Sequence, residues 1–570
     1  MPRPPNGAPS GTPESCDGFA VLPAERLLLL SGTTARPWAE GEQAGALHTN
    51  LGRVEGPLRT VFTGERFHLA FALPHLPALQ ARALEVAPGR VLPIAAARPT
   101  PAEDALAALR RALAGAPAAV QAAIRPLLPR RAFGGTDTVP LLASRAVHLE
   151  VDRVLRLPGA GLLVWGWRMD LGGAVSAIRL CTPQGEAALD LAAAIPVPRP
   201  DVREAARTYA PTHDDWGFCA FVPLEAPPGT PLWLEVELAD GETGERALQP
   251  ADSAGLATIR QVLALPRAPG SRLEAAMEGT LGPAVEALNA ARLARPRRVE
   301  ELAFGAQPAR PRLSVVVPLH GRLDFMELQL ALFSARPDPG IELIYVLDDP
   351  PRRAECEQMA LAAEARFGLG FRLVLLEENL GFAPACNEGA RRARAPFLCL
   401  LNSDVFPLPG EGMAALSALP ARLEADEGLG AVGPLLLYED GTVQHEGMRF
   451  EAVRGLPPWP FPIHPRKAHP APPGAALLEA PAITGACLAL RRAEWEALGG
   501  FDEGFVIGDF EDSDLCLRLR ARGLRCAVDT GARLYHLERQ SQEEGAGWRF
   551  HATLFNAWRH ARRWAGTIGA

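Results

Sequence analysis

Acidic residues gather in one short segment near the C-terminal end of the sequence. Between Gly508 and Asp514 there are four carboxylates within six residues, directly before a helix predicted at residues 515–522. Like charges this close repel each other, and capping of the helix can hold one or two of them. A further carboxylate at the start of the helix is well placed to remove a proton from a hydroxyl group. The candidates for such a general base are these four carboxylates.

Two other positions offer ligands for a divalent cation. An apolar strand predicted at residues 397–401 stops at Asn402, and Asp404 follows two positions later, so that both side chains can face the same way. Mg²⁺ and Mn²⁺ prefer oxygen ligands, and they take only one or two from protein when phosphate groups supply the rest. His536 ends another strand-like segment, and a neutral imidazole is a further candidate ligand. Taken alone, an Asn-x-Asp triplet such as residues 402–404 more often forms a turn than a metal site. A lone His is likewise more often structural.

The second half of the chain predicts the scaffold that positions these groups. Continuous apolar runs rich in β-branched residues occur at residues 315–318, 341–347 and 371–376, and helices are predicted between them at 325–334 and 353–367. Such runs are typical of strands buried on both faces of a parallel sheet. The alternation of strands and helices indicates an open α/β sheet, whose ligands bind at the carboxyl ends of the strands.

Polar and glycine residues follow these strands. Asp348 and Asp349 come directly after the second strand, where a carboxylate can accept hydrogen bonds from a uracil imide or a ribose hydroxyl. The stretch at residues 379–389 contains glycines that let the backbone approach a ligand closely. The structural alternatives are that the aspartates start a turn and that the stretch is a loop with a helix cap.

Taken in order, these motifs resemble the inverting family 2 glycosyltransferases of the GT-A fold, including the rhamnosyl- and galactofuranosyl-transferase-like members. The resemblance covers about residues 313–541 and rests on the order and spacing of five motifs. It implies Asp404 as the metal-binding residue, completed by His536, and it assigns Glu511 and Asp512 to the acceptor side, with Asp512 preferred as the base. The positions implied on the donor side are Pro318, Asp348, Asp349, Asn379, Gly381, Asn387 and Asn402.

The resemblance also implies a reaction, in which a sugar passes in a single in-line displacement from a nucleotide-sugar donor to an acceptor. The expected donor is a UDP- or dTDP-sugar, the expected metal is Mn²⁺ or Mg²⁺, and the expected acceptor is a glycan or lipid-linked glycan in bacterial cell-surface polysaccharide biosynthesis. Two positions depart from the family pattern. Asp349 is followed by two prolines where a hydroxyl is usual, and Asn402 stands where an acidic residue is common.

The chain has 570 residues, too many for one hydrophobic core, since about 150 residues per domain is usual. A capping box at Thr100 begins a helical pattern, and residues 147–151 alternate between apolar and polar as in a strand. The predicted parts are a disordered tail at 1–17, a β-rich accessory region at 18–98, a helical connector at 99–131, a β-sandwich-like accessory domain at 140–250, a helical linker at 251–310, the α/β GT-A domain at 311–541 and an amphipathic helix at 542–570. In the sandwich, Trp165 and Trp167 could stack on sugar rings, although core packing is the more common role.

Composition limits the partners and the compartment. A net charge of −8 without clustered Lys and Arg argues against nucleic acid. Nine cysteines without a CxxC pair indicate reduced thiols in the cytoplasm. The Pro- and Gly-rich first residues predict a mobile tail rather than a secretion signal, and no membrane-spanning helix is expected because the sequence has no run of 18 or more apolar residues. The basic C-terminal helix could contact the inner membrane peripherally, but docking on the catalytic domain is the preferred interpretation.

Two alternative functions remain open from the sequence. A GT-A-like nucleotidyltransferase would share the nucleotide-binding sheet, but it has no need of an acidic pair such as Glu511 and Asp512 before a late helix. A catalytically degenerate protein could instead act as a glycan-binding or assembly module through its N-terminal β domains. Glycan binding by residues 1–300 alone would favour this second alternative.

Overall fold

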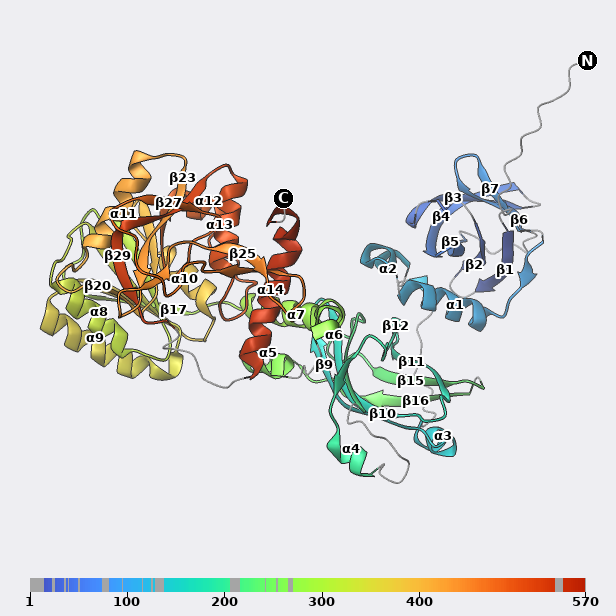
Figure 1. Cartoon of the computed structure of the whole chain (residues 1–570). Coiled ribbons are helices and arrows are strands. Elements are labelled where there is room, and N and C mark those ends of the chain that lie inside the picture. Colours follow the sequence, from blue (N-terminus) through green and yellow to red (C-terminus); the bar gives the residue numbers. More distant parts are fainter. Residues whose placement is uncertain are drawn as a thin grey trace, which may run out of the picture. The chain divides into compact units, whose positions relative to one another are not determined.

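A computed structural model of the chain divides into two compact units, Met1–Asp252 and Ser253–Ala570 (Figure 1). Of the tail predicted to be disordered, residues 1–14 lie outside the described residues, and residues 15–17 belong to the first strand. The structure describes residues 15–22, 26–34, 37–38, 40–49, 52–73, 81–94, 96–114, 116–124, 127–128, 138–205, 216–240, 242–252, 255–264, 270–538 and 547–568.

The first part of unit 1 is an antiparallel sheet covered by helices. Its strands run in the order β7-β6-β3-β4-β5-β2-β1, with β8 added parallel to β1. Leu106, Leu109 and Leu113 lie on one face of the following helix and pack on the sheet, so the segment predicted as a connector helps to form this core. The elements are β1 (Ser15–Leu22), β2 (Leu27–Thr33), β3 (Gly41–Thr49), β4 (Gly52–Thr63), β5 (Arg66–Ala72), β6 (Ala81–Ala87), β7 (Arg90–Pro93), β8 (Arg98–Pro99), α1 (Ala102–Ala114) and α2 (Ala118–Ile124).

The second part of unit 1 consists of two antiparallel sheets, β13-β14-β10-β9 and β12-β11-β15-β16, which share one apolar core. Trp165 and Trp167 are only partly buried, and the Arg199 guanidinium lies 5.6 Å from the ring centroid of Trp167. The elements are α3 (Thr138–Ser144), β9 (His148–Leu157), β10 (Gly161–Met169), β11 (Val175–Thr182), β12 (Gly185–Ala188), β13 (Ile195–Val197), α4 (Pro200–Ala205), β14 (Gly217–Val222), β15 (Leu232–Leu238) and β16 (Thr243–Leu248).

Unit 2 is built on a mixed sheet in the order β17-β20-β19-β18-β21-β28-β23-β29-β22, with β24 beside β23 and β27 beside β29. The first elements of unit 2 along the chain are α5 (Gly255–Ala264), α6 (Gly270–Ala276), η3 (Met277–Leu281), α7 (Gly282–Leu293) and β17 (Val299–Phe304). The sheet continues with β18 (Leu313–Leu319), α8 (Asp324–Ser334), β19 (Ile341–Leu347), η4 (Pro350–Arg352), α9 (Arg353–Phe367), β20 (Phe371–Leu376), α10 (Phe382–Ala390) and β21 (Phe397–Leu401). The remaining elements are β22 (Val405–Pro407), α11 (Ala414–Ala425), β23 (Leu429–Leu437), β24 (Val443–His445), β25 (Arg449–Ala452), β26 (Pro460–Ile463), β27 (Leu477–Ala480), β28 (Cys487–Arg491), α12 (Arg492–Leu498), α13 (Glu511–Ala521), β29 (Arg525–His536) and α14 (Gly547–Ile568).

Helices cover both faces of this sheet. The strands β20, β19, β18 and β21 are parallel to one another, and their side chains alternate between two apolar cores. Val315 and Val317 face α8, α9 and α11, whereas Val316 faces α10, α12 and α13. This burial on both faces explains why the strands are apolar throughout.

The segment at residues 251–310 differs from the helical linker expected there. After α7 it forms β17, which pairs antiparallel with β20 and extends the mixed sheet of unit 2, and Phe304 stacks on Phe371 with ring centroids 5.0 Å apart. Edge strands are only half buried, so Glu300 and Glu301 interrupt the apolar pattern that reveals the inner strands. The helices of this segment likewise belong to unit 2.

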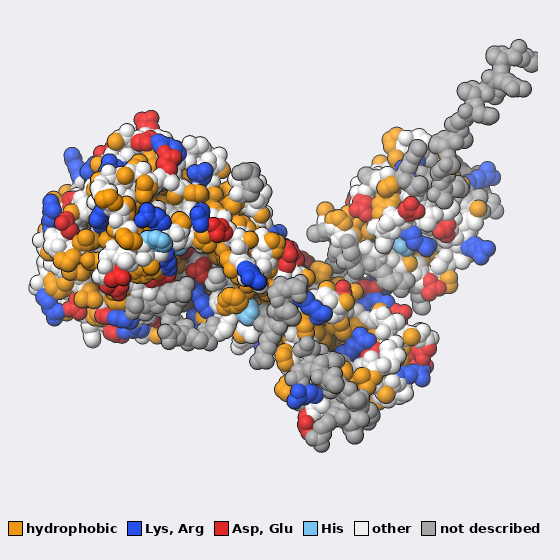
Figure 2. Space-filling model, in the orientation of Figure 1, with side chains coloured by type: hydrophobic (Ala, Val, Ile, Leu, Met, Phe, Trp, Pro, Cys, Tyr) orange, Lys and Arg blue, Asp and Glu red, His pale blue; other side chains and the backbone are white. Residues whose placement is uncertain are grey.

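Helix α14 packs on the rest of unit 2. Its apolar residues Leu554, Phe555 and Trp558 are buried, and the Trp558 indole N–H donates to Glu278 Oε1 of η3 at 2.7 Å. The docked arrangement is therefore the one present, and the apolar face is not available to a membrane. No helix among the described residues is both long and apolar enough to span a bilayer. On the face shown in Figure 2, basic and acidic side chains are interspersed over unit 2.

Candidate active site

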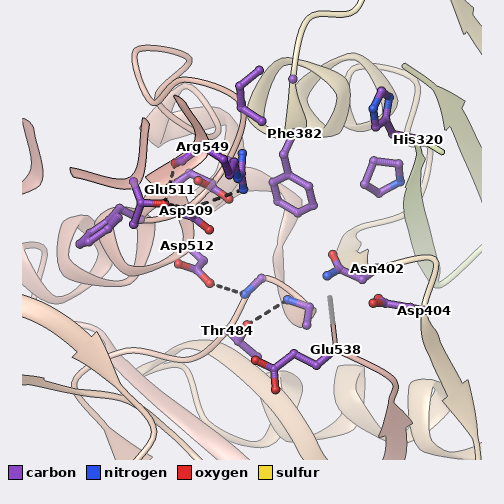
Figure 3. A pocket seen from close by; sticks show the side chains of 18 of the residues that line it. His320, Phe382, Asn402, Asp404, Thr484, Asp509, Glu511, Asp512, Glu538 and Arg549 are labelled. Atoms are coloured by element: carbon purple, nitrogen blue, oxygen red, sulfur yellow. Dashed lines mark hydrogen bonds and ion pairs between the residues drawn. The ribbon is translucent and has the colours of Figure 1, made fainter. Parts of the chain in front are cut away.

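A cavity of about 740 Å³ opens at the carboxyl ends of β18, β19 and β21 in unit 2. This is the edge of the sheet at which the α/β pattern predicts a ligand. Among the residues predicted from the sequence, the lining includes Pro318, Asp348, Asn379, Gly381, Asn402, Asp404, Glu511, Asp512 and His536. Side chains from segments far apart in the sequence therefore meet in one place (Figure 3).

On one side of the cavity, Asp404 and His536 form a pair. Strand β22 pairs antiparallel with β29 so that Val405 lies opposite His536, which brings His536 Nε2 to 3.5 Å from Asp404 Oδ1. Both side chains are about nine-tenths buried. His536 Nδ1 and Asn402 Oδ1 are buried and have no hydrogen-bond partner among the described residues.

This pair fits a divalent cation whose coordination a bound diphosphate completes. Within the described part of the chain, no group of three or more His, Cys, Asp or Glu side chains could hold a metal by itself. Asp404 and His536 can supply one carboxylate oxygen and one imidazole nitrogen, and the unpartnered Asn402 oxygen is a further polar group nearby. Two protein ligands are enough when phosphate oxygens provide the others.

Asp348 is hydrogen-bonded to the loop at residues 380–381 in the wall of the cavity. Its Oδ1 accepts a hydrogen bond from the Leu380 N–H at 2.6 Å, and its Oδ2 accepts one from the Gly381 N–H at 2.8 Å. Gly381 has φ of +93°, a conformation that glycine adopts without strain. Burial raises the pKa of Asp348 to about 7, although both N–H groups and Arg292 act in the opposite direction.

Two of the residues expected on the donor side lie outside the cavity. Asp349 Oδ2 accepts a hydrogen bond from the Gly321 N–H at 3.2 Å, so its carboxylate supports the neighbouring turn. Asn387 faces the interior, where its amide bonds both the N–H and the C=O of Phe501 and also donates to Glu503. Helix α10 turns Asn387 away from the glycines that precede it, which spacing along the chain does not reveal.

On the opposite side of the cavity, α13 begins at Glu511, earlier than predicted, so the acidic pair occupies its first turn. Asp512 Oδ2 accepts a hydrogen bond from the Gly485 N–H at 2.8 Å, and Oδ1 accepts one from the Ser513 N–H at 2.6 Å. Burial raises the pKa of Asp512, and a nearby Asp509 acts in the same direction. The carboxylate is thus held in a fixed orientation at the cavity.

Glu511 is less exposed to solvent than Asp512. Only 5% of it is exposed, and its Oε2 has no hydrogen-bond partner among the described residues. Burial raises the pKa of Glu511 well above its usual range, with further contributions from Asp512 and Asp509. Asp514, the last of the four carboxylates, lies outside the cavity and pairs with Arg518 and Arg563.

The loop before α13 is strained and is held by α14. Ile507, Asp509 and Phe510 have positive φ angles of 69°, 88° and 76°, which side chains other than glycine rarely adopt. Thr553 Oγ1 donates to Asp509 Oδ2 at 2.8 Å, and Asn556 bonds the backbone of the same loop. Such strain persists only where the surroundings enforce it, and it is concentrated at functional sites.

Several lining residues were not identified from the sequence as parts of the site. Lys467 lies in the proline-rich segment 456–473, and it pairs with Glu538 at 2.7 Å. Arg260 comes from α5, and Trp548 and Arg549 come from α14. No motif marks these positions, because only the packing of α5 and α14 brings them to the sheet.

Comparisons with known proteins identify the domain that contains this cavity. Residues 314–492 match the family model described as Glycosyl transferase family 2. The match confirms the expected family and, together with the mixed α/β sheet, the expected GT-A fold of the C-terminal domain. Glu511, Asp512 and His536 lie beyond the matched residues.

Three curated proteins show the range of relatives. The chain is 32% identical over 241 residues to the O-antigen biosynthesis protein RfbC of Myxococcus xanthus, covering 41% of this chain and 18% of that protein. It is 26% identical over 240 residues to the uncharacterized protein y4gI of Sinorhizobium fredii, covering 41% and 25%. It is 28% identical over 219 residues to the N-acetylgalactosaminyltransferase 6 of Drosophila melanogaster, covering 37% and 31%. The matches thus span less than a third of each relative.

Two solved structures are also similar. One is the mannosyltransferase PcManGT from Pyrobaculum calidifontis in complex with GDP-Man and Mn²⁺, with 18% identity, a TM-score of 0.32, and coverage of 54% of this chain and 76% of that chain. The other is GalNAc-T7 with UDP, GalNAc and Mn²⁺, with 17% identity, a TM-score of 0.33, and coverage of 46% and 49%.

Proposed function

We propose, from the premise that residues 314–492 form a family 2 glycosyl transferase domain, that the chain is a metal-dependent inverting glycosyltransferase. It moves a sugar from a nucleoside-diphosphate donor to a glycan or lipid-linked glycan acceptor. The similarity to an O-antigen biosynthesis protein supports a role in cell-surface polysaccharide biosynthesis. A UDP- or dTDP-sugar is the proposed donor.

The observation that carries this proposal is the division of one cavity between two kinds of group. Asp404 lies on one side, and Glu511 and Asp512 lie on the other (Figure 3). A cation site and a proton acceptor on opposite sides of a common space suit a displacement at a carbon held between them. A protein that only bound glycans would have no need of buried carboxylates with raised pKa values there.

Each side has its own chemical role. Asp404 and His536 would hold Mn²⁺ or Mg²⁺, and the metal would supply positive charge that neutralises the diphosphate. Asp348 fixes the loop at Leu380 and Gly381 against which the nucleoside lies. The proposal places the donor sugar between this side of the cavity and the acidic pair.

Asp512 is the proposed general base, since two backbone N–H groups orient its carboxylate at the cavity. The acceptor hydroxyl gives its proton to Asp512 while its oxygen bonds the anomeric carbon. The bond from that carbon to the diphosphate oxygen breaks, and the nucleoside diphosphate leaves. One displacement inverts the configuration, and no covalent intermediate is formed.

We place the reaction in the cytoplasm, at the inner membrane where lipid-linked acceptors are available. All nine cysteines are buried free thiols, as expected where disulfides do not form. Because the apolar face of α14 is packed inward, contact with the membrane arises through the acceptor in this proposal.

The test is a screen of the full chain against UDP-, dTDP-, GDP- and CMP-sugars with Mn²⁺, with Mg²⁺ and with EDTA, following donor binding and slow donor hydrolysis. We expect one nucleotide sugar to bind and to be hydrolysed only with a divalent metal. If no sugar nucleotide binds under any metal condition, the proposal is wrong, and glycan binding by a degenerate domain becomes the better account.

A further inference from the structure

One wall of the cavity comes from two helices outside the segment that matches the family model. Helix α5 precedes that segment and contributes Arg260, whereas α14 follows it and contributes Trp548, Arg549, Phe550 and Thr553. The two helices pack against each other. Residues from before and after the family domain thus complete its cavity.

This wall adjoins the acidic pair. Thr553 Oγ1 donates to Asp509 Oδ2 at 2.8 Å, and an Arg549 guanidinium nitrogen lies 3.5 Å from the same oxygen. Asp509 directly precedes the turn that begins α13 at Glu511. Figure 3 shows Arg549, Asp509 and Glu511 together, on the side of the cavity away from Asp404. The wall is therefore on the side proposed for the acceptor.

Arg260 differs from the other long basic side chains of the cavity. Lys467 pairs with Glu538, and Arg549 pairs with Asp509. Arg260 has no carboxylate partner among the described residues, and its buried Nε has no hydrogen-bond partner there. Its guanidinium lies over the Trp548 ring, 4.8 Å from the centroid. An arginine held this way presents its donors to a planar anion such as a carboxylate, or to a phosphate.

Aromatic side chains line the same cavity as Arg260. Trp548 is partly exposed and Phe550 is 54% exposed, and both line the cavity with Phe461 from β26. Flat apolar rings suit the C–H faces of a sugar. The wall thus offers ring contact and one anion-binding group side by side.

We propose that α5 and α14 form an acceptor subsite for a sugar residue that carries an anionic group. Arg260 binds the anion, and Trp548 and Phe550 contact the ring. This inference rests on the proposed function, and it adds the chemical class of the acceptor. The anion is a carboxylate, as in a uronic acid, or a phosphate, as in a sugar phosphate.

The experiment measures binding of three small probes to the full chain by ligand-observed NMR titration, without donor or metal. The probes are methyl β-D-glucoside, methyl β-D-glucuronide and glucose 1-phosphate. We expect at least one anionic probe to bind about tenfold or more tightly than the glucoside, which corresponds to one charge-assisted interaction. Comparison of the two anionic probes identifies the carboxylate or the phosphate as the preferred group.

Variants locate the effect. Arg260→Gln should remove the preference for the anionic probe and Arg260→Lys should retain part of it, whereas Trp548→Ala should weaken all three probes. The matched control Arg310→Gln changes an exposed arginine with no ion pair among the described residues, and it should bind as the unaltered chain does. Asp404→Asn should also keep the preference, since it lies on the other side. Thermal unfolding of each variant verifies that it is folded.

Equal affinity for the neutral and anionic probes, or a preference that survives in Arg260→Gln, would overturn the subsite. Loss of the preference in Asp404→Asn would also overturn it, because the anion would then belong to the donor side. Hydrolysis of sugar nucleotides by the unaltered chain is measured in parallel. A clear anionic preference without any hydrolysis would support the subsite and contradict the proposed function.

Discussion

The side-chain amide of Asn556 is hydrogen-bonded to both backbone polar groups of Val506. Asn556 Oδ1 accepts a bond from the Val506 N–H at 2.9 Å, and Nδ2 donates to the Val506 C=O at 3.1 Å and to the Gly508 C=O at 2.8 Å. Asn556 is fully buried in α14, and Val506 begins the strained loop before Glu511. The C-terminal helix therefore fixes the position of the acidic pair.

The substitution Asn556→Leu tests whether these hydrogen bonds hold the loop in place. The substitution leaves the buried Val506 N–H and the Gly508 C=O without the partner that Asn556 provides, so we expect the free energy of unfolding to fall by about 1–3 kcal/mol. Turnover should fall more than donor affinity, because the loop leads directly into the first turn of α13, which carries the proposed base. Denaturant unfolding, kcat and donor Kd provide the measurements, and Thr567→Ala at the exposed end of α14 is the control. Unchanged kcat in a destabilised Asn556→Leu protein would contradict the claim that α14 positions the acidic pair.

The pH dependence of the reaction should report the proposed base. Asp512 must be deprotonated to accept a proton, and burial raises its pKa. We therefore expect kcat/KM to increase with pH along a limb that lies above the range of an ordinary carboxyl group. Asp512→Asn should lower kcat by about 10²–10⁴-fold. A rate that is flat across mildly acidic pH would contradict this assignment.

Glu511 should reduce stability at high pH. Its pKa in the folded protein is raised, so the stability linked to its protonation is present below the unfolded pKa and is lost as pH rises through the folded pKa. We expect Glu511→Gln to raise Tm relative to the unaltered chain, by more at pH 8 than at pH 5. The exposed Glu439→Gln should show no such difference. A lower Tm for Glu511→Gln at pH 8 would contradict the interpretation of Glu511 as a buried, poorly solvated acid.

Asp348 should control the donor loop. An amide has one acceptor oxygen, so Asp348→Asn can accept from the Leu380 N–H or the Gly381 N–H but presents its own NH₂ group to the other. We expect a weaker donor affinity and a loss of about 1–3 kcal/mol of stability at pH 5. Because the folded pKa is about 7, the stability linked to protonation is lost as pH rises through 7. The Asn variant should lack that dependence, which unfolding at pH 5 and pH 8 can measure.

Much of the sheet can be predicted from the sequence, because its inner strands are apolar on both faces. The runs at 341–347, 371–376 and 397–401 are strands with those same bounds, and α9 also has the bounds expected of it. β17 was not recognised, because an edge strand with two glutamates lacks that pattern. Local hydrophobicity therefore predicts the centre of the sheet better than its edge.

The site is predictable to the extent that its residues follow strand ends. Asp404 and His536 meet because strand pairing brings their strand ends together, and the motifs locate both. Asn387 and Asp349 belong to the same motifs but point elsewhere, since the motif fixes the position along the chain and not the direction of the side chain. Arg260 could not be found, because α5 reaches the cavity only through tertiary packing.

The most direct test separates donor binding from turnover in matched variants of the full chain. Donor Kd and kcat are measured with Mn²⁺ for Asp404→Asn, Asp512→Asn and the exposed control Glu439→Gln. The account predicts that Asp404→Asn loses metal-dependent donor binding, that Asp512→Asn keeps the donor Kd but loses turnover, and that Glu439→Gln is unchanged. Donor binding that is independent of Asp404, or full turnover by Asp512→Asn, would contradict the division of the cavity into a donor side and a base side.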